Sequence, residues 1–356
     1  MKLQIAVLAG DGIGPEITQE ACRVLRAVAD RHGHLLSLGH GLIGGAAIDA
    51  EGDALPFETI ELCRNSRAIL LGAVGGPKWS DPNAKVRPEQ GLLALRKTFG
   101  LFANLRPVKP DPHVLKYSPI KEEYLKDVDL LVVRELTGGI YFGDKLRDEN
   151  SATDVCRYTV DEIERVLRLA GKLAMGRRRK LVSVDKANVL ETSRLWRSTA
   201  QRIYADEFPE LEVEHILVDA AAMYLINRPA DFDVMVTENM FGDILTDEAS
   251  MLAGSLGMLP SASLGEAGDG LPFGLYEPIH GSAPDIAGQG IANPYATILS
   301  TALMLRLSFG LEEEAAAIEA AVAAAVKDGV LTADLVRGAA TPVSTVQAAD
   351  AVLERL

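Results

Sequence analysis

The chain has 356 residues, 48% of them hydrophobic, which is enough for two ordinary domains with substantial cores. Its formal net charge of −14 argues against nucleic-acid and membrane partners, because an acidic surface repels phosphate groups and anionic lipid. The three cysteines form no CxxC motif, and neither a membrane-length apolar run nor a signal peptide is evident, so we expect a cytoplasmic protein.

Short apolar runs alternate with helical periodicities along the chain. The first predicted helix has Pro15 near its first turn and Gly33 after its last. The predicted strands are 4–9, 67–74, 129–135, 180–186, 212–219 and 231–238, and the predicted helices are 14–33, 160–175, 192–206, 220–227 and the tail from 294. This alternation predicts an α/β fold with a mostly parallel sheet that carries helices on both faces.

Two segments interrupt the alternation. Residues 75–91 contain three prolines and no periodicity, so we expect a long functional or mobile loop there. Residues 137–160 contain strand-like pieces joined by a charged turn, which is typical of an arm that projects from the body of a domain and pairs with a second subunit.

The stretch GDGIGPE at 10–16 follows a strand and opens a helix, as a dinucleotide-binding turn would. The G-x-G-x-x-G fingerprint needs a third glycine for close packing of the helix on the strand, and Pro15 occupies that position. We therefore predict a tight turn with a proline that starts the helix, and not an ordinary Rossmann motif.

Three acidic residues occupy the carboxyl ends of predicted strands or the segments just beyond them. Asp243 and Asp247 lie one helical turn apart, where like charges repel, and Asp219 closes the strand HILVD. A solvated acidic face would explain the pair alone. Because ligands of open α/β sheets bind at the carboxyl ends of the strands, and no Cys or His lies nearby, we predict that these acids bind Mg²⁺ or Mn²⁺.

Three arginines suit a small substrate with two carboxylates, because a guanidinium binds a carboxylate in a bidentate fork. They are Arg96, Arg106 and Arg134, each of which could also form an ordinary surface ion pair. Lys186 at the end of a strand could act as a base if a nearby cation lowered its pKa, and Tyr141 could assist it, although a solvated lysine and a packing tyrosine are the simpler explanations. Residues 280–294 are rich in small side chains, so their backbone could approach a nucleotide closely.

Eight segments in order resemble the β-decarboxylating dehydrogenases, the family of the isocitrate and isopropylmalate dehydrogenases. They are GDGIGPE, GGPKW, RPEQGLLALRK, LFANLRPV, VVRELTGGIYFG, VDKANVL, FGDILTDEAS and HGSAPDIAGQGIANP, and together they cover essentially the whole chain. The resemblance implies two α/β domains without a Rossmann motif and an active site in the cleft between them. Residues 1–101 and 252–356 would form the cofactor-binding domain, and residues 102–251 the substrate, metal and dimerisation domain, with the arm at about 137–160.

The resemblance also implies the reaction. Within the family, the similarity is to members that oxidise (2R,3S)-3-isopropylmalate with NAD⁺ to 4-methyl-2-oxopentanoate and CO₂ in leucine biosynthesis. Such enzymes are homodimers, in which Lys186 and Asp219 would reach into the partner's active site. Relatives that act on tartrate, 3-methylmalate or homoisocitrate are the nearest alternative, and a non-catalytic regulatory subunit is the alternative from another functional class.

The resemblance assigns roles by position. Lys186 would be the catalytic base and Tyr141 would help to protonate the product carbon. The metal ligands would be Asp219, Asp243 and Asp247. The substrate-binding residues would be Glu89, Leu92, Leu93, Arg96, Arg106, Arg134 and Asp219. The cofactor-binding residues would be Gly76, Glu89, His280, Gly281, Ser282, Ala283, Pro284, Asp285, Ile286, Ala287, Gly288 and Asn293.

Two positions bear on specificity. Asp285 lies where NADP-dependent members tend to carry a lysine, and a carboxylate there would accept hydrogen bonds from the adenosine ribose hydroxyls and repel a 2′-phosphate, so we expect NAD. Leu92 and Leu93 offer an apolar wall for an isopropyl group. Tyr295 lies where a smaller aliphatic residue is expected, beside the predicted adenine-binding loop.

Overall fold

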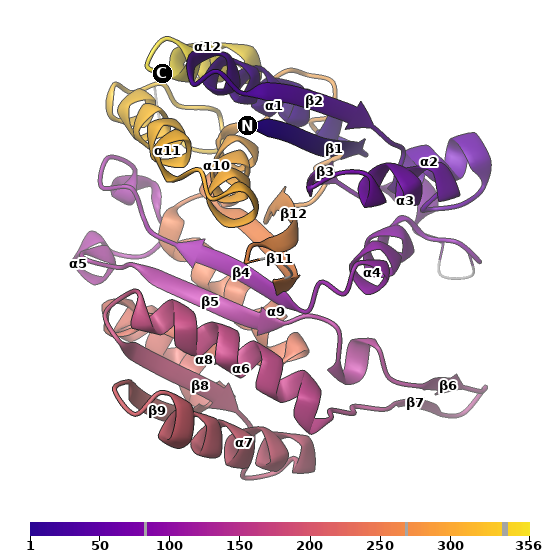
Figure 1. The fold of residues 1–356 in the computed structure, drawn as a ribbon, viewed down its shortest axis with the longest axis vertical. Coiled ribbons are helices and arrows are strands. Elements are labelled where there is room, and N and C mark those ends of the chain that lie inside the picture. Colours follow the sequence, from indigo (N-terminus) through magenta and orange to yellow (C-terminus); the bar gives the residue numbers. More distant parts are fainter. Residues whose placement is uncertain (82–83, 268–269, 337–340) are drawn as a thin grey trace. The chain divides into compact units, whose positions relative to one another are not determined.

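The computed structural model of the chain describes all residues except 82–83, 268–269 and 337–340. It has an α/β architecture with mostly parallel strands, which confirms the predicted fold class (Figure 1). No helix in the described part of the chain is long and apolar enough to cross a lipid bilayer. Residues 82 and 83 belong to the predicted long loop, so this part of that prediction lies outside the described residues.

The chain divides into two compact units. The first unit comprises Met1–Leu101 and Gly254–Leu356, and the second unit comprises Phe102–Ala253. The second division therefore lies slightly later in the chain than the boundary after residue 251 that the sequence predicted. The assignment of the cofactor to one unit and of the metal to the other stays a prediction.

The described residues of the first unit form five strands in the order β2-β1-β3-β12-β11, parallel except for the β11–β12 pair. Its core contains Leu8, Ile69 and Leu71 from the strands, packed against Ile43 and Leu95. The elements are β1 (Lys2–Gly10), α1 (Gly14–Arg31), β2 (Leu35–His40), α2 (Gly44–Glu51), α3 (Phe57–Arg64), β3 (Ala68–Ala73), η1 (Pro77–Trp79), α4 (Pro88–Thr98), η6 (Leu256–Met258), β11 (Pro260–Ala267), β12 (Pro272–Pro278), α10 (Tyr295–Phe309), α11 (Glu312–Lys327) and α12 (Thr345–Leu353).

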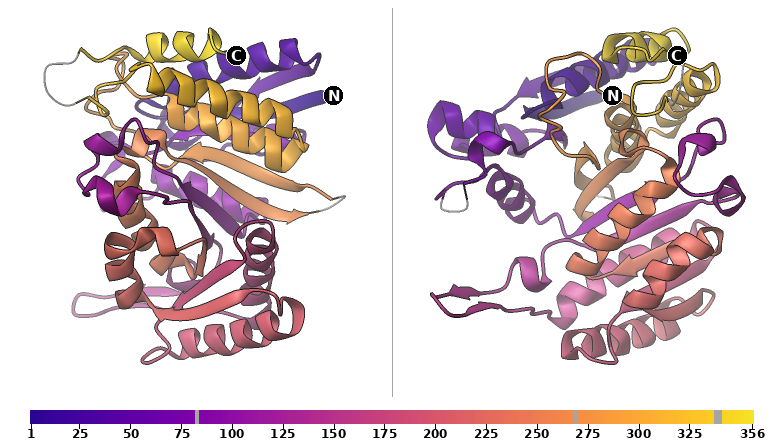
Figure 2. Two further views of the ribbon diagram at one scale, coloured as in Figure 1. Left: turned by 90° about the vertical axis from the view of Figure 1, so that its left-hand side faces the viewer. Right: turned by 180° about the vertical axis from the view of Figure 1, so that it is seen from behind.

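The second unit contains five strands in the order β4-β5-β10-β8-β9, parallel except for the β4–β5 pair. Helices α6 and α7 cover one face of these strands, and α8 and α9 cover the other (Figures 1 and 2). The elements are β4 (Ala103–Val108), η2 (Leu115–Tyr117), α5 (Glu122–Leu125), β5 (Leu130–Glu135), η3 (Gly139–Tyr141), β6 (Lys145–Arg147), β7 (Ala152–Asp154), α6 (Val160–Met175), β8 (Lys180–Asp185), α7 (Glu191–Glu207), β9 (Glu212–Leu217), α8 (Val218–Asn227), η4 (Pro229–Asp231), β10 (Val234–Thr237), α9 (Asn239–Ser250) and η5 (Met251–Ala253).

The predicted arm contains a two-stranded antiparallel hairpin, β6–β7. Every residue of these two strands is exposed, and the hairpin extends away from the helices of its unit (Figure 2). A short, isolated hairpin of this kind is at most marginally stable in water by itself. Its pairing with a second subunit stays a prediction.

The glycine-rich turn after β1 has the predicted form. Gly10 and Gly12 both have positive φ angles, +71° and +59°, and α1 begins at Gly14 with Pro15 in its first turn. A Cβ atom on Gly10 would lie 1.9 Å from the carbonyl oxygen of Ala73, so only glycine fits there. The tight-turn prediction is confirmed.

Two local predictions were wrong. Asp219 does not end a strand, because β9 stops at Leu217 and Asp219 lies in the first turn of α8. The segment 75–91 is not free of regular structure, because η1 interrupts it and α4 begins at Pro88. Proline is well tolerated in a first helical turn, so it marks the start of this helix and not a loop.

Candidate active site

The end of β5 and the start of α9 bring an arginine, an amide, an acid and a tyrosine together in the second unit. Arg134 is 4% exposed, and its Nε and Nη2 donate to Oδ1 of Asn239 at 3.0 and 2.8 Å. Its Nη1 forms an ion pair with Asp243, whose other carboxylate oxygen accepts from the Tyr141 hydroxyl at 2.9 Å. Three of the predicted site residues are therefore in contact with one another, and Asn239 is a partner that the sequence analysis missed.

Arg106 on β4 occupies a similar place beside the second acid of α9. Its Nε donates to Asn104 Oδ1 at 2.8 Å, and its Nη1 donates to Thr246 Oγ1 at 2.7 Å and lies 3.4 Å from Asp247 Oδ1. Asp243 and Asp247 thus each lie beside an arginine, which offsets their mutual repulsion.

Gly242, at the centre of the motif FGD, lies where Arg134 leaves no room for a side chain. A Cβ atom there would lie 2.6 Å from Cγ of Arg134 and would displace the arginine from its acid. Glycine inside a helix costs roughly 1 kcal/mol relative to alanine. The close approach of α9 to Arg134 is the compensating gain.

Tyr141 holds its proton firmly. Burial, followed by the hydrogen bond to Asp243, raises the pKa of its hydroxyl to about 12. A phenol with this pKa remains a proton donor throughout the neutral range. The geometry therefore suits Tyr141 as an acid and not as a base.

Lys186 directly follows β8, and its Nζ lies 2.6 Å from Oδ1 of Asp219 on α8. The hydrogen bond from this ammonium lowers the pKa of the Asp219 carboxyl, which is therefore ionised at neutral pH. The two residues form a pair of their own. Their contacts within the described residues do not include Asp243 or Asp247.

Asp243 and Asp247 fit a hard divalent cation by charge and by donor atom. Their side chains are 37% and 72% exposed, and they lie one turn apart on α9. Carboxylate oxygens that water can also reach suit Mg²⁺ or Mn²⁺, which retain water ligands. In the described part of this chain, no three His, Cys, Asp or Glu side chains lie close enough to hold a metal, so the chain brings two of the three predicted ligands together.

Arg96, the third predicted arginine, belongs to the first unit. It is 9% exposed on α4, and its Nη2 donates to Glu277 Oε1 at 2.9 Å. Its Nε is buried and has no hydrogen-bond partner among the described residues, so it could bind an anion without breaking the ion pair. Glu277 lies just before the HGSAP motif, and the sequence analysis did not single it out.

The other predicted residues of α4 are more accessible. Glu89 is exposed, whereas Leu92 and Leu93 are half-buried. Leu92 packs against the apolar core of the first unit, so Leu93 is the freer of the two leucines. Gly76 precedes η1 in an extended conformation, and a Cβ atom there would lie 3.0 Å from the Trp79 ring.

The loop after β12 is fixed to the glycine-rich turn. The Ile13 amide donates to the carbonyl of Ser282 at 2.8 Å, and a Cβ atom on Gly12 would lie 2.0 Å from the same oxygen. Ile286 and Ala287 pack against a small cluster that includes Ile13. Ser282, Ile286 and Ala287 therefore hold the loop in place, and Ala283 has a positive φ of 37° at its bend.

The accessible part of this loop fits a dinucleotide. Gly281, Pro284, Asp285 and Gly288 are exposed, and a Cβ atom on Gly281 or Gly288 would meet no described atom within 4 Å. The Nε2 atom of His280 is buried and has no hydrogen-bond partner among the described residues, and burial lowers its pKa, so the imidazole is neutral. A polar group of a bound cofactor could form the hydrogen bond that this buried nitrogen lacks.

Asn293 and Tyr295 close the loop. Asn293 is 6% exposed; its Oδ1 accepts from the Tyr295 amide at 2.9 Å, and its Nδ2 donates to Asp334 Oδ2 at 3.0 Å. The Tyr295 ring is fully buried, and its hydroxyl donates to the carbonyl of Val330 at 2.7 Å. The unusual tyrosine therefore packs in the core of the first unit.

Comparisons with known proteins identify the family. The family described as isocitrate/isopropylmalate dehydrogenase matches residues 4–352. The 3-isopropylmalate dehydrogenase of Anaeromyxobacter dehalogenans is 59% identical over 361 residues, which cover 100% of both proteins, and that of Heyndrickxia coagulans is 57% identical over 360 residues, which cover 100% of this chain and 97% of the relative. The crystal structure of isocitrate dehydrogenase from Methylococcus capsulatus superposes with a TM-score of 0.86 at 34% identity, covering 99% of this chain and 98% of that one. This chain belongs to the isocitrate/isopropylmalate dehydrogenase family.

Proposed function

We propose that this chain catalyses the NAD⁺-dependent oxidative decarboxylation of (2R,3S)-3-isopropylmalate to 4-methyl-2-oxopentanoate and CO₂, a step of leucine biosynthesis. The observation that carries this proposal is the similarity over the full length to relatives named 3-isopropylmalate dehydrogenase, at up to 59% identity. The chain also carries the site residues that the sequence predicted, namely the three arginines, the two acids of α9, Tyr141 and Lys186.

The substrate has two carboxylates, and the chain offers positive charge for both. Arg106 and Arg134 would bind and orient them from the second unit, and Arg96 belongs to the first unit. A guanidinium can bind a carboxylate through two parallel N–H donors. Arg134 pairs with Asp243, and Arg106 pairs with Asp247. A substrate with two carboxylates that binds together with a divalent cation would therefore add little net charge to the site.

A bound NAD⁺ would accept hydride from C2, and Mg²⁺ or Mn²⁺ held by Asp243 and Asp247 would stabilise negative charge on the substrate oxygens. Lys186 would remove the hydroxyl proton at the oxidation step. After CO₂ leaves, Tyr141 would donate its proton to the carbon that carried the carboxylate, because its pKa of about 12 keeps that proton available.

A homodimer would complete the metal site. Lys186 and Asp219 form a pair apart from Asp243 and Asp247 in one chain, so a second copy could supply them. Large apolar side chains near these residues are also exposed: Val189 by 61%, Met223 by 62% and Ile244 by 59%. An apolar surface of this kind is typical of a subunit interface.

Steady-state kinetics would test the proposed function. Purified enzyme is expected to form NADH from 3-isopropylmalate with Mn²⁺ present, and to stop when the metal is chelated. A panel with tartrate, 3-methylmalate and homoisocitrate tests the choice of substrate. A higher kcat/KM for an unbranched malate would contradict that choice, and no activity with any of these substrates would indicate a regulatory subunit.

The preference for NAD is expected to depend on Asp285. The Asp285→Lys substitution removes an acceptor for the ribose hydroxyls and adds a charge that attracts a 2′-phosphate, so kcat/KM for NAD⁺ should fall by about 10- to 100-fold while that for NADP⁺ rises. Both constants can be measured with 3-isopropylmalate held saturating. Asp30→Lys, the same charge change at an exposed position of α1, should leave the ratio unchanged. An unchanged ratio in Asp285→Lys would show that another residue selects the cofactor.

A further inference from the structure

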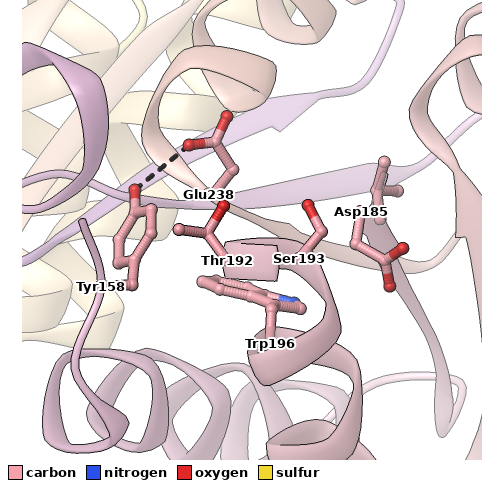
Figure 3. A pocket seen from close by; sticks show the side chains of 7 residues that line it. Tyr158, Asp185, Thr192, Ser193, Trp196 and Glu238 are labelled. Carbon is pink, nitrogen blue, oxygen red and sulfur yellow. Dashed lines mark hydrogen bonds between the residues drawn. The ribbon is translucent and has the colours of Figure 1, made fainter. Parts of the chain in front are cut away.

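A buried polar cluster lies behind the arginine and the tyrosine of the second unit. It consists of Glu135, Tyr158, Glu238 and Asn239, which are all less than 9% exposed. None of them was among the residues predicted from the sequence. Figure 3 shows Tyr158 and Glu238 facing one another across a small pocket that Trp196 also lines.

The Tyr158 hydroxyl is the centre of this cluster. It accepts a hydrogen bond from the backbone amide of Asn239 at 3.0 Å, and it lies 3.4 Å from Glu135 Oε2 and 3.3 Å from Glu238 Oε2. One hydroxyl proton can be donated to only one of the two carboxyl groups at a time. Burial raises the pKa of both carboxyl groups and so disfavours their charged forms. The hydroxyl therefore lies between two carboxyl groups that do not readily ionise at the same time.

Each partner of Tyr158 anchors a different segment of the candidate active site. Glu135 accepts from the amide of Gly138 at 2.8 Å, in the turn that leads to η3 and Tyr141. Glu238 caps α9, the helix of the two acids, by accepting from the Phe241 amide at 2.8 Å.

Asn239 makes the direct link to the substrate-binding arginine. Its Oδ1 accepts two hydrogen bonds from Arg134, and its Nδ2 donates to the carbonyl of Gly138 at 3.1 Å. The amide group of one side chain thus connects Arg134 with the turn before Tyr141. Its own backbone is fixed by Tyr158.

The Tyr158 ring is packed independently of its hydroxyl. Trp196 meets it edge to face, with 6.1 Å between the ring centroids. Cβ atoms on Gly138 and Gly139 would lie 2.6 and 2.5 Å from atoms of Tyr158, so these glycines let the turn lie directly on the tyrosine. A phenylalanine could therefore keep most of the packing and lose the hydroxyl contacts alone.

We propose that Tyr158 is a positioning residue: its hydroxyl joins Glu135, Glu238 and Asn239, and thereby fixes Arg134, Tyr141 and the start of α9 relative to one another for binding of the diacid substrate. This inference rests on the proposed function. The hydrogen-bond partners of the Tyr158 hydroxyl among the described residues are Glu135, Glu238 and Asn239, so Tyr158 acts on Arg134 and on the acids of α9 through these residues.

The Tyr158→Phe variant tests this role against Tyr204→Phe. Tyr204 is a matched control, since it belongs to the same unit, is 3% exposed and donates one hydrogen bond to the carbonyl of Leu167 at 3.1 Å. Both variants should lose thermal stability. Only Tyr158→Phe is expected to raise KM for 3-isopropylmalate, by about five- to tenfold, and to lower kcat, because a misplaced arginine binds the carboxylate less well.

The KM for NAD⁺ should stay within about twofold in both variants, because the predicted cofactor loop belongs to the other unit. Equal values of KM and kcat for 3-isopropylmalate in the two variants would overturn the proposal. If Tyr158→Phe does not fold, Asn239→Ala replaces it, and an unchanged substrate KM in that variant is equally decisive. Wild-type enzyme that is inactive on 3-isopropylmalate would refute the proposed function. An active wild type with equal KM values in the two variants would refute the positioning role alone.

Discussion

Replacing Asp243 with asparagine is expected to lower kcat/KM for 3-isopropylmalate by about 10³-fold and to raise the Mn²⁺ concentration needed for half-maximal activity. A cation held by carboxylates is worth several kcal/mol of charge stabilisation, and each 1.4 kcal/mol is a factor of ten in rate. The new amide nitrogen would also face either Arg134 or Tyr141, both of which donate to Asp243. One substitution would therefore remove a proposed metal ligand and disturb two neighbouring donors.

The metal dependence separates this effect from simple misfolding. Mn²⁺ binding can be measured by calorimetry on folded protein, with the melting temperature recorded alongside. Asp231→Asn is a suitable control, since it makes the same change at a largely exposed residue of the same unit, whose carboxylate forms an ion pair with Arg228. If Asp243→Asn kept its turnover and its response to Mn²⁺, the α9 acids would not be the metal site.

The spacing of Asp243 and Asp247 indicated a cation, but the structure adds a second explanation for the pair. Each acid lies beside an arginine, Arg134 and Arg106 respectively. Strand pairing places these arginines near α9 from positions more than one hundred residues earlier. A sequence without its fold reveals neighbours along a helix, because their distance is fixed by helical geometry, but not neighbours brought together by a sheet.

Most of the strands that the sequence predicted are buried apolar runs; the exception is β9, which alternates exposed and half-buried positions before the buried Ile216. Strand β5 is buried at every position, as is β3. The strands that were missed differ in composition or exposure. Strand β2 has no fully buried position, and β11 begins PSAS, so neither presents a continuous buried apolar run. Tertiary packing, and not local preference, makes these segments strands.

The same limit applies to the site. Lys186 and Tyr141 were singled out as candidates from the sequence and received their roles from the family resemblance, whereas Asn239 and Glu277 were missed. Asn239 lies two residues before the motif FGDILTDEAS, but its role depends on its hydrogen bonds with Arg134, which comes from a distant part of the sequence. A buried amide or acid that supports another side chain leaves no periodic signal in the sequence, so only the structure reveals it.

Replacing Lys186 with methionine is expected to lower kcat by about 10³-fold, because a positioned general base typically contributes 10²- to 10⁴-fold. Methionine keeps much of the length of the side chain and removes the amine. The substitution also deprives Asp219 of its ion-pair partner, so the pKa of that carboxyl should return toward its ordinary value. Lys180→Met, at the opposite end of the same strand and largely exposed, should retain nearly full activity.

A mixed dimer distinguishes a lysine that acts in its own subunit from one that acts in the partner's. If Lys186 and Asp219 complete the partner's site, a dimer of one Lys186→Met chain and one Asp243→Asn chain has one site with both defects and one site with none. Random pairing makes about half of the dimers mixed, so co-expressed chains should recover about a quarter of wild-type activity although each variant alone is inactive. Purified mixed dimers that stay inactive would place Lys186 and Asp243 in the same subunit's site, because each site would then carry one of the two defects.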